Sequence, residues 1–161
     1  NIPGKKYAFD STTIPLCLAT FPWAKFRSKK GGVKAHVLYD VEAQVPAFYT
    51  VTTASKHDST AMSSITYEPN RYYIFDRAYD TFKELYKIHL TGSYYVADPK
   101  ELEVQNGKME AKNAKECKKK WLVELFFKWL KQHLNIKRFW GTTKNAVRIQ
   151  ISVAIITYCL V

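Results

Sequence analysis

The chain lacks the signatures of several large protein classes. It has no glycine-rich GxGxxG or GKS/T loop, which argues against the common dinucleotide and nucleoside triphosphate sites. Its three cysteines, Cys17, Cys117 and Cys159, form no CxxC pair and predict neither a disulfide framework nor a zinc site. The longest apolar run, residues 151–161, is far shorter than the roughly 20 residues that cross a bilayer. With only 6 glycines, 6 prolines and 47% hydrophobic residues, we expect one globular domain over residues 1–161.

Acidic residues are also scarce. The sequence has 14 Asp and Glu against 25 Lys and Arg, which gives a formal net charge of +11 and a pI near 9.5. This excess favours a polyanionic partner, with nucleic acid first and an acidic membrane surface second. The chain opens at Asn1 without a basic segment followed by an apolar one, so we expect a fragment that has no signal peptide and works in a reducing cytoplasm.

Hydrophobic periodicity predicts an α/β domain in which three strands come first and helices and strands then alternate. The predicted strands are residues 7–10, 33–41, 47–53, 72–75 and 93–97, and the predicted helices are 59–64, 82–91, 121–134 and 145–161. A lysine-dense connector at about 98–119 precedes the long amphipathic helix. This order is that of an RNase H-like mixed sheet, with three antiparallel strands and flanking helices.

Two predicted strands end on a carboxylate. Asp10 follows the first strand and Asp76 follows the strand 72–75. These strands are neighbours in an RNase H-like sheet, where adjacent strands lie about 4.8 Å apart, so the two carboxylates should meet. Close carboxylates repel each other unless a cation lies between them, and Mg²⁺ prefers such oxygen ligands. The pair therefore indicates metal-assisted phosphoryl transfer.

A third carboxylate is expected from the helix 121–134. Glu124 is the only acidic residue between Trp121 and the end of the chain, and its sequence neighbours are apolar. We expect an ionised carboxylate in such surroundings to need a metal ion or another cation. Lys128 and Lys131 follow near the same face of the helix, where they are suited to phosphate.

Four segments carry a resemblance to a known family. The segments are FDSTT at 9–13, KHD at 56–58, FDRAYD at 75–80 and ELFFKWLKQHL at 124–134. Together they resemble the DDE-type transposases of bacterial insertion sequences, in the IS-four group. The resemblance spans nearly the whole chain and implies an RNase H-like catalytic domain whose metal-binding triad is Asp10, Asp76 and Glu124, with two Mg²⁺ or Mn²⁺ ions. Lys131 matches the family lysine, which follows the glutamate after six intervening residues.

The sequence departs from the family pattern in two places. The family arginine and tyrosine before the glutamate fall on Lys120 and Cys117, and lysine binds phosphate only as a point charge. The connector at about 98–119 stands where the family carries a longer β-rich insertion, so the domain resembles a shortened copy.

The resemblance implies a cut-and-paste DNA transposase that hydrolyses a phosphodiester at the transposon end and then joins the freed 3′-hydroxyl to target DNA. Its implied partners are transposon-end and target DNA and a second copy of the chain in a synaptic complex, at the nucleoid in the cytoplasm and without a membrane. Arg77, Lys120, Lys128 and Lys131 are the expected phosphate-binding residues.

Two alternatives stay open. One is a general RNase H-like nuclease with the same triad and no strand transfer, and the other is an inactive, basic DNA-binding remnant, which the shortened connector and the altered Lys120 favour. The pair His57 and Asp58 suggests either a general base or, with better odds, a helix cap in a polar turn. The helix aromatics Trp121, Phe126, Phe127 and Trp129 are interpreted as core residues.

Overall fold

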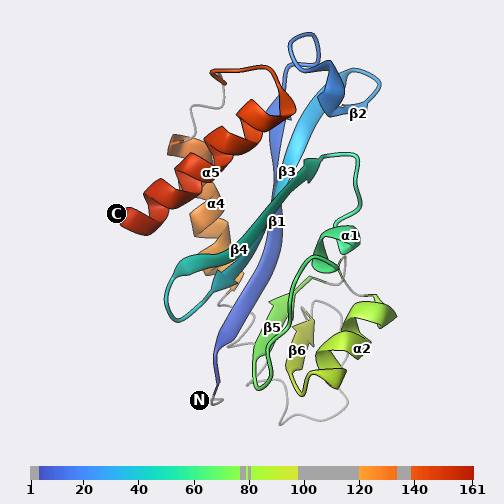
Figure 1. Ribbon diagram of the computed structural model, residues 1–161, viewed down its shortest axis with the longest axis vertical. Helices are drawn as coiled ribbons and strands as arrows, with labels where there is room; N and C mark the ends of the chain where they lie inside the picture. Colours follow the sequence, from blue (N-terminus) through green and yellow to red (C-terminus); the bar gives the residue numbers. More distant parts are fainter. Residues whose placement is uncertain (1–3, 77–78, 80, 98–119, 134–138) are drawn as a thin grey trace.

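A six-stranded mixed sheet with helices on both faces forms the centre of the computed structural model, which describes residues 4–76, 79, 81–97, 120–133 and 139–161 (Figure 1). The elements are β1 (Lys6–Leu16), η1 (Pro22–Ala24), β2 (Lys25–Arg27), β3 (Lys30–Asp40), β4 (Val45–Thr53), α1 (Ser59–Met62), β5 (Tyr72–Phe75), α2 (Phe82–Leu90), β6 (Tyr94–Ala97), α4 (Trp121–His133) and α5 (Lys144–Leu160). The predicted α/β order is confirmed. The connector predicted at about 98–119 lies outside the described residues.

The sheet has the strand order β2-β3-β1-β5-β6, with β4 also paired to β3. β1 runs antiparallel to β3 and parallel to β5, and β5 runs parallel to β6. The predicted antiparallel group of three strands is therefore present as β1, β3 and β4. The short β2 is an addition to the predicted strands, because the basic segment after η1 turns back as a hairpin from β2 into β3.

β1 is longer than the predicted strand 7–10. It continues through Leu16 and pairs with β3 along the whole way, so Asp10 lies inside the strand and the expectation that it ends the strand is wrong. The physical reason is that Thr12, Thr13 and Ile14 are β-branched and suit a pleated sheet. β5 ends at Phe75, which pairs with Phe9, so only the parallel neighbour stops at this level.

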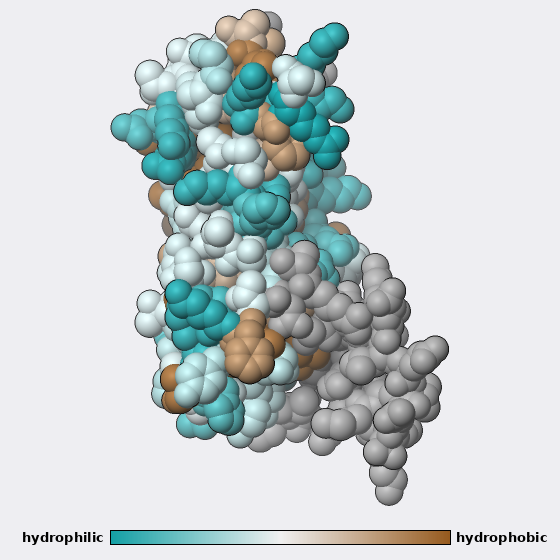
Figure 2. Space-filling view, turned by 90° about the vertical axis from the view of Figure 1, so that its right-hand side faces the viewer, coloured by the Kyte–Doolittle hydropathy of each residue, from teal (hydrophilic) through white to brown (hydrophobic). Residues whose placement is uncertain are grey.

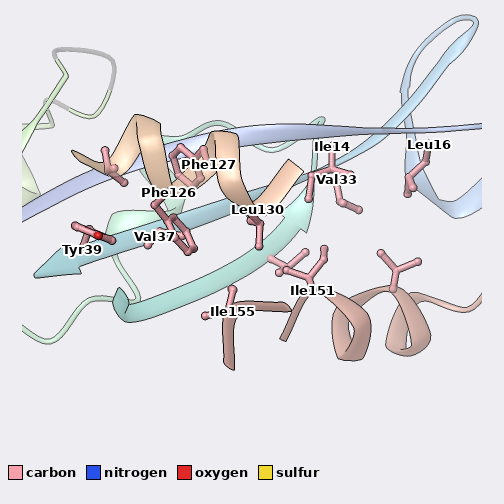
Figure 3. Close-up of a cluster of buried hydrophobic side chains, with 14 of the residues drawn as sticks. Ile14, Leu16, Val33, Val37, Tyr39, Phe126, Phe127, Leu130, Ile151 and Ile155 are labelled. Carbon is pink, nitrogen blue, oxygen red and sulfur yellow. The ribbon is translucent and has the colours of Figure 1, made fainter. Parts of the chain in front are cut away.

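The face of the sheet covered by α4 and α5 holds the larger core. Figure 3 shows side chains of both helices directed at alternate residues of β1 and β3. The fully buried members include Ala8, Ile14, Val33, Ala35, Val37, Val123, Phe126, Leu130, Val147 and Ile151. Phe126 and Phe127 are in the core as predicted and Trp129 packs against it, but Trp121 is 59% exposed at the start of α4 and does not belong to it.

The opposite face is covered by α1 and α2. Its core is a second cluster of Tyr7, Phe9, Leu38, Ala61, Met62, Ile65, Tyr67, Tyr73, Phe75, Tyr79 and Ile88. Because side chains alternate along a strand, consecutive residues of β1 contribute to different faces. Ala8 belongs to the α4 side and Phe9 to the α1 side. This alternation decides where the polar residues that follow them point.

The ends of the helices follow the sequence only in part. Gly92 has φ +68° and closes α2 as predicted, because glycine adopts this left-handed conformation without strain. Thr81 and Asp58 stand at helix starts, but neither side chain makes a capping hydrogen bond. Within the described ranges, none of the helices is long and apolar enough to cross a membrane. Figure 2 shows a largely hydrophilic face with hydrophobic side chains in small separate patches.

Candidate active site

Two of the predicted acids lie on neighbouring strands. The register pairs Phe9 of β1 with Phe75 of β5, which places Asp10 and Asp76 at the next level of the same parallel pair. The Asp10 carboxylate accepts a hydrogen bond of 2.8 Å from the backbone N–H of Ser11. Asp76 is 40% exposed and its Oδ1 forms an ion pair with the ammonium of Lys120. The chain thus brings both acids to one place, as predicted.

Three charged side chains, those of Lys120, Asp76 and Glu124, act on the Asp10 carboxyl. The pKa of the Asp10 carboxyl is raised to about 6, chiefly by burial; Lys120 and the Ser11 N–H oppose this rise, and the charges of Asp76 and Glu124 add to it. A charged group shifts the pKa of an acid in this way only when it lies nearby, because solvent screens more distant charges. The charges of Asp76 and Glu124 thus both act on Asp10, and Lys120 is the cation that opposes them.

Glu124 acts on Asp10 from α4. The buried residues of this helix are Val123, Phe126, Phe127 and Leu130, which face the sheet. Glu124 itself is exposed. The expectation that it lies in apolar surroundings is therefore wrong, because the helix directs its apolar sequence neighbours to the core and turns Glu124 away from it. The need for a cation rests instead on the repulsion between Glu124 and Asp10.

The predicted phosphate-binding lysines lie along the same helix. Lys120, Glu124, Lys128 and Lys131 follow one another at spacings of four, four and three residues, so they form one stripe along α4. Lys128 and Lys131 are exposed, whereas Lys120 is only 8% exposed and is held by Asp76. Arg77, the fourth predicted contact, lies outside the described residues.

The donor set suits a divalent cation in its chemistry. Asp10, Asp76 and Glu124 offer carboxylate oxygens, the ligands that Mg²⁺ and Mn²⁺ prefer, and an ammonium already stands against Asp76 as a monovalent cation. Over the described part of the chain, no three His, Cys, Asp or Glu side chains are close enough together to hold an ion. The three acids fit a divalent ion in charge and ligand type. In this structure the Asp76 carboxylate is paired with the ammonium of Lys120.

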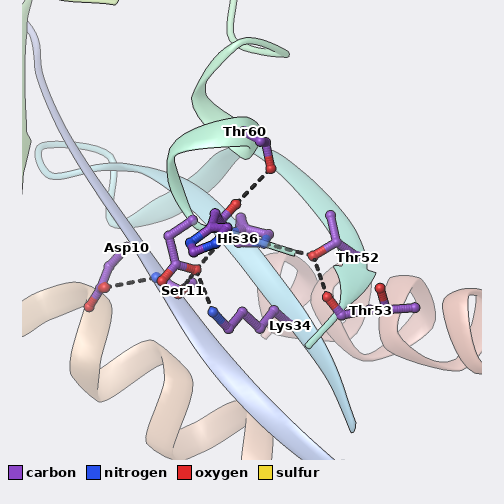
Figure 4. A network of polar contacts seen from close by, with 9 residues as sticks. Asp10, Ser11, Lys34, His36, Thr52, Thr53 and Thr60 are labelled. Atoms are coloured by element: carbon purple, nitrogen blue, oxygen red, sulfur yellow. Dashed lines mark hydrogen bonds and ion pairs between the residues drawn. The ribbon is translucent and has the colours of Figure 1, made fainter. Parts of the chain in front are cut away.

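A second polar cluster lies directly behind Asp10, on the other face of the sheet. The Ser11 hydroxyl donates to Asp58 Oδ1 at 3.2 Å, and the Lys34 ammonium donates to the same oxygen at 2.9 Å. Nδ1 of the fully buried His36 lies 3.8 Å from that oxygen. Figure 4 shows this network beside the Asp10 carboxylate, which is bonded to the Ser11 N–H. The Asp58 carboxylate accepts these hydrogen bonds, and it makes no capping hydrogen bond to α1.

His36 is neutral in this cluster. His36 Nε2 and Thr52 Oγ1 are hydrogen-bonded at 3.0 Å, and the Thr52 hydroxyl also donates to the Thr53 carbonyl. Its Nδ1 has no hydrogen-bond partner among the described residues. Burial lowers the pKa of His36 to about 4, against the opposing effect of Asp58. His57, the neighbour of Asp58 in the sequence, is exposed, and its backbone carbonyl accepts from Thr60.

Tyr79 belongs to the cluster on the α1 side of the sheet. It lies just after Asp76 in the chain, is buried, and its hydroxyl is hydrogen-bonded with the Ser11 hydroxyl. Burial raises the pKa of Tyr79, and Asp10, Asp58 and Asp76 raise it further. Sequence reasoning missed Ser11, Lys34 and His36 as parts of the site. The available signal was weak, because Lys34 and His36 alternate with the apolar Val33, Ala35 and Val37 and so lie on the more polar side of the predicted strand.

Comparison of the whole fold defines the class of the protein. The catalytic core domain of BIV integrase superposes with a TM-score of 0.53, over 96% of this chain and 83% of that one, at 10% sequence identity. At this identity the likeness concerns the fold, which is RNase H-like. The class that the structure defines is therefore that of RNase H-like domains, with a mixed sheet between two layers of helices.

Sequence comparison gives the family. Residues 3–160 match the family described as "Transposase DDE domain", and the chain belongs to it. A relative from Geobacillus stearothermophilus, named as a probable transposase for insertion sequence element IS5377, is 28% identical over 99% of this chain and 56% of its own length. A relative from Sinorhizobium fredii, also named as a transposase (y4zB), is 26% identical over 94% of this chain and 58% of its own length. The chain thus spans just over half the length of these curated relatives.

Proposed function

We propose that this chain is the catalytic domain of a DNA transposase, which hydrolyses a phosphodiester at a transposon end and transfers the freed strand to target DNA. The family match and the RNase H-like fold support this reaction class. The observation that carries the residue assignment is electrostatic: the charges of Asp76 and Glu124 both act on the buried carboxyl of Asp10. This effect supports, as a proposal, a shared site for the three acids.

Asp10, Asp76 and Glu124 would hold the divalent ions, Mg²⁺ or Mn²⁺, which number two in the proposed reaction. When bound, such ions activate water as a nucleophile and stabilise the leaving 3′ oxygen. The protein supplies a fixed scaffold for the acids. Asp10 is fixed by the Ser11 N–H and by its position within β1, and Asp76 by the end of β5.

The polar stripe of α4 is the proposed DNA contact. Lys128 and Lys131 are exposed beyond Glu124, so they are placed to hold phosphates on one side of the scissile bond. From Lys120 to Lys131 the helix rises about 16 Å at 1.5 Å per residue, enough to follow a few nucleotides of backbone. We further propose that the domain works on transposon-end and target DNA as a pair of copies at the nucleoid.

The substitution Asp76→Asn tests the assignment. We expect it to abolish Mn²⁺-dependent nicking of supercoiled plasmid, a loss of at least about a thousandfold, while duplex DNA binding is kept or improved because less negative charge faces the phosphates. The matched control is Glu68→Gln, an exposed acid paired with Arg71, which should nick like the unmodified chain. Undiminished nicking by Asp76→Asn would remove Asp76 from the site.

Strand transfer separates the transposase from the two alternatives. Duplexes with free 3′-hydroxyl ends should be joined to plasmid by the unmodified chain in Mn²⁺, and gel-resolved joint molecules report the reaction. A chain that nicks but never joins is a nuclease. A chain that binds DNA with strong salt dependence but takes up no Mn²⁺ is a basic remnant.

A further inference from the structure

Lys120 occupies an unusual place for a lysine. Its side chain is 10% exposed, and its ammonium is paired with Asp76 Oδ1 just before the first turn of α4. It also acts on Asp10 more strongly than any other cation does. A buried ammonium is stable only where carboxylates compensate its charge. Lys120 therefore stands where two neighbouring strands bring their acids together.

The charge at this place is not balanced by Lys120 alone. Asp10, Asp76 and Glu124 contribute three carboxylates, and Lys120 contributes one positive charge. A divalent ion bound to Asp76 would stand within a few ångströms of the ammonium, and two cations that close repel each other strongly in a partly buried site. The ion and the ammonium would therefore compete for the negative charge of Asp76.

We propose that Lys120 is a built-in competitor of the divalent ion: its ammonium holds Asp76 in the metal-free protein and must leave Asp76 when the ion binds. This deepens the proposed function and rests on it, because it concerns the regulation of the same site. Metal loading then converts Lys120 from a partner of Asp76 into a free cation at the head of the α4 stripe, where Lys128 and Lys131 already face outward. Metal binding and release of the Lys120 ammonium are then coupled. A DNA phosphate that binds the released ammonium would therefore favour metal binding.

Calorimetric titration with Mn²⁺ in the absence of DNA tests the proposal. We expect Lys120→Met to bind Mn²⁺ about tenfold more tightly than the unmodified chain, because no ammonium has to be displaced. Lys120→Arg, which keeps the charge, should bind within about threefold of the unmodified chain. Lys6→Met is the matched control, since Lys6 is also a buried lysine paired with a carboxylate, that of Glu42, but lies at the start of β1 away from the three acids; its Mn²⁺ affinity should not change.

The outcomes separate the two proposals. Equal or weaker Mn²⁺ binding by Lys120→Met, with normal binding by the unmodified chain and none by Asp76→Asn, overturns the competitor role and leaves the metal site intact. Binding by Lys120→Met alone supports the competitor role in its strongest form. No Mn²⁺ binding by the unmodified chain, Lys120→Met or Lys120→Arg overturns the metal site itself.

A measurement on the unmodified chain covers the case in which Lys120→Met fails to fold. Acylation of Lys120 by an amine-reactive reagent, followed by mass spectrometry, should be slow without metal and several-fold faster with saturating Mn²⁺. Lys6 provides the internal reference and should react at the same rate in both conditions. A Lys120 rate that stays constant or falls on addition of Mn²⁺ contradicts displacement.

Discussion

The two faces of the sheet differ in the balance between acids and cations. On the α1 side, Asp58 is met by Lys34 and lies beside His36, so one acid has a full positive partner and a neutral neighbour. On the α4 side, the charges of two further acids act on Asp10, and Lys120 is the cation that opposes them. A stable core needs the first arrangement. In the proposed function, a bound divalent ion would supply the positive charge that the second arrangement lacks.

The adjacency of the two clusters is a consequence of the strand. Asp10 and Ser11 are consecutive in β1, so their side chains point to opposite faces, and the Ser11 N–H still reaches the Asp10 carboxylate. The Asp58 cluster thereby helps to fix the position of Asp10. Ser11 is held by Asp58 on one side and supports Asp10 on the other.

The largest stability difference between the faces should appear on removing one acid from each. Asp58→Ala leaves Lys34 largely buried without a partner, and we expect a loss of about 3 kcal/mol in the free energy of unfolding. Glu124→Gln removes repulsion from Asp10, so it should leave stability unchanged or slightly raised. Urea unfolding of both variants in a chelating buffer gives the comparison, and equal losses would show that the faces do not differ.

The pH dependence of stability should have opposite signs on the two faces. Asp10 has a raised pKa of about 6, so the folded state holds its proton more tightly and this group's contribution to stability falls as pH rises from about 4 to 6. His36 has a lowered pKa of about 4, so protonation favours the unfolded state and its contribution rises as pH goes from 4 to about 6.5. Each shift of about two units corresponds to a few kcal/mol at most.

Single substitutions should reveal each slope. Between pH 4 and 6, Asp10→Asn removes the falling contribution, so its stability relative to the unmodified chain improves as pH rises. His36→Gln removes the rising contribution, so its relative stability declines over the same range. Urea unfolding at several pH values, without metal, measures both. Relative stabilities that do not depend on pH would contradict the assigned environments of the two groups.

The smallest expected effect concerns the exposed end of the α4 stripe. Lys128→Gln combined with Lys131→Gln should reduce the slope of log affinity for duplex DNA against log salt by about 1 to 2, since each lysine contributes about one released counterion. The free energy of unfolding should stay within about 0.5 kcal/mol because both side chains are exposed. Fluorescence anisotropy over a salt series measures the slope, and an unchanged slope would place the DNA elsewhere.

The sequence predicts the frame of this site better than its details. The order of strands and helices follows from local periodicity, and the acids Asp10 and Asp76 follow from their places relative to two strands. The length of β1 was not predictable from its polar Ser-Thr-Thr segment, because pairing with β3 along its whole length decides it. The Asp58 cluster joins residues from three elements, and only the folded chain shows that Ser11 and Lys34 share one carboxylate oxygen.

Lys120 illustrates the limit of pattern reasoning for the site. Its position in the motif predicts a phosphate contact, and that prediction has not been tested by the geometry. Its burial and its pairing with Asp76 depend on how α4 approaches the end of β5, which no local pattern encodes.

A crystal structure grown with Mn²⁺, with the ion located by anomalous scattering, tests the central claim most directly. The account predicts a manganese peak about 2 Å from carboxylate oxygens of both Asp10 and Asp76, with Glu124 turned toward it and the Lys120 ammonium withdrawn from Asp76. A structure at saturating Mn²⁺ that has no peak between these acids, and in which Lys120 still contacts Asp76, would contradict it.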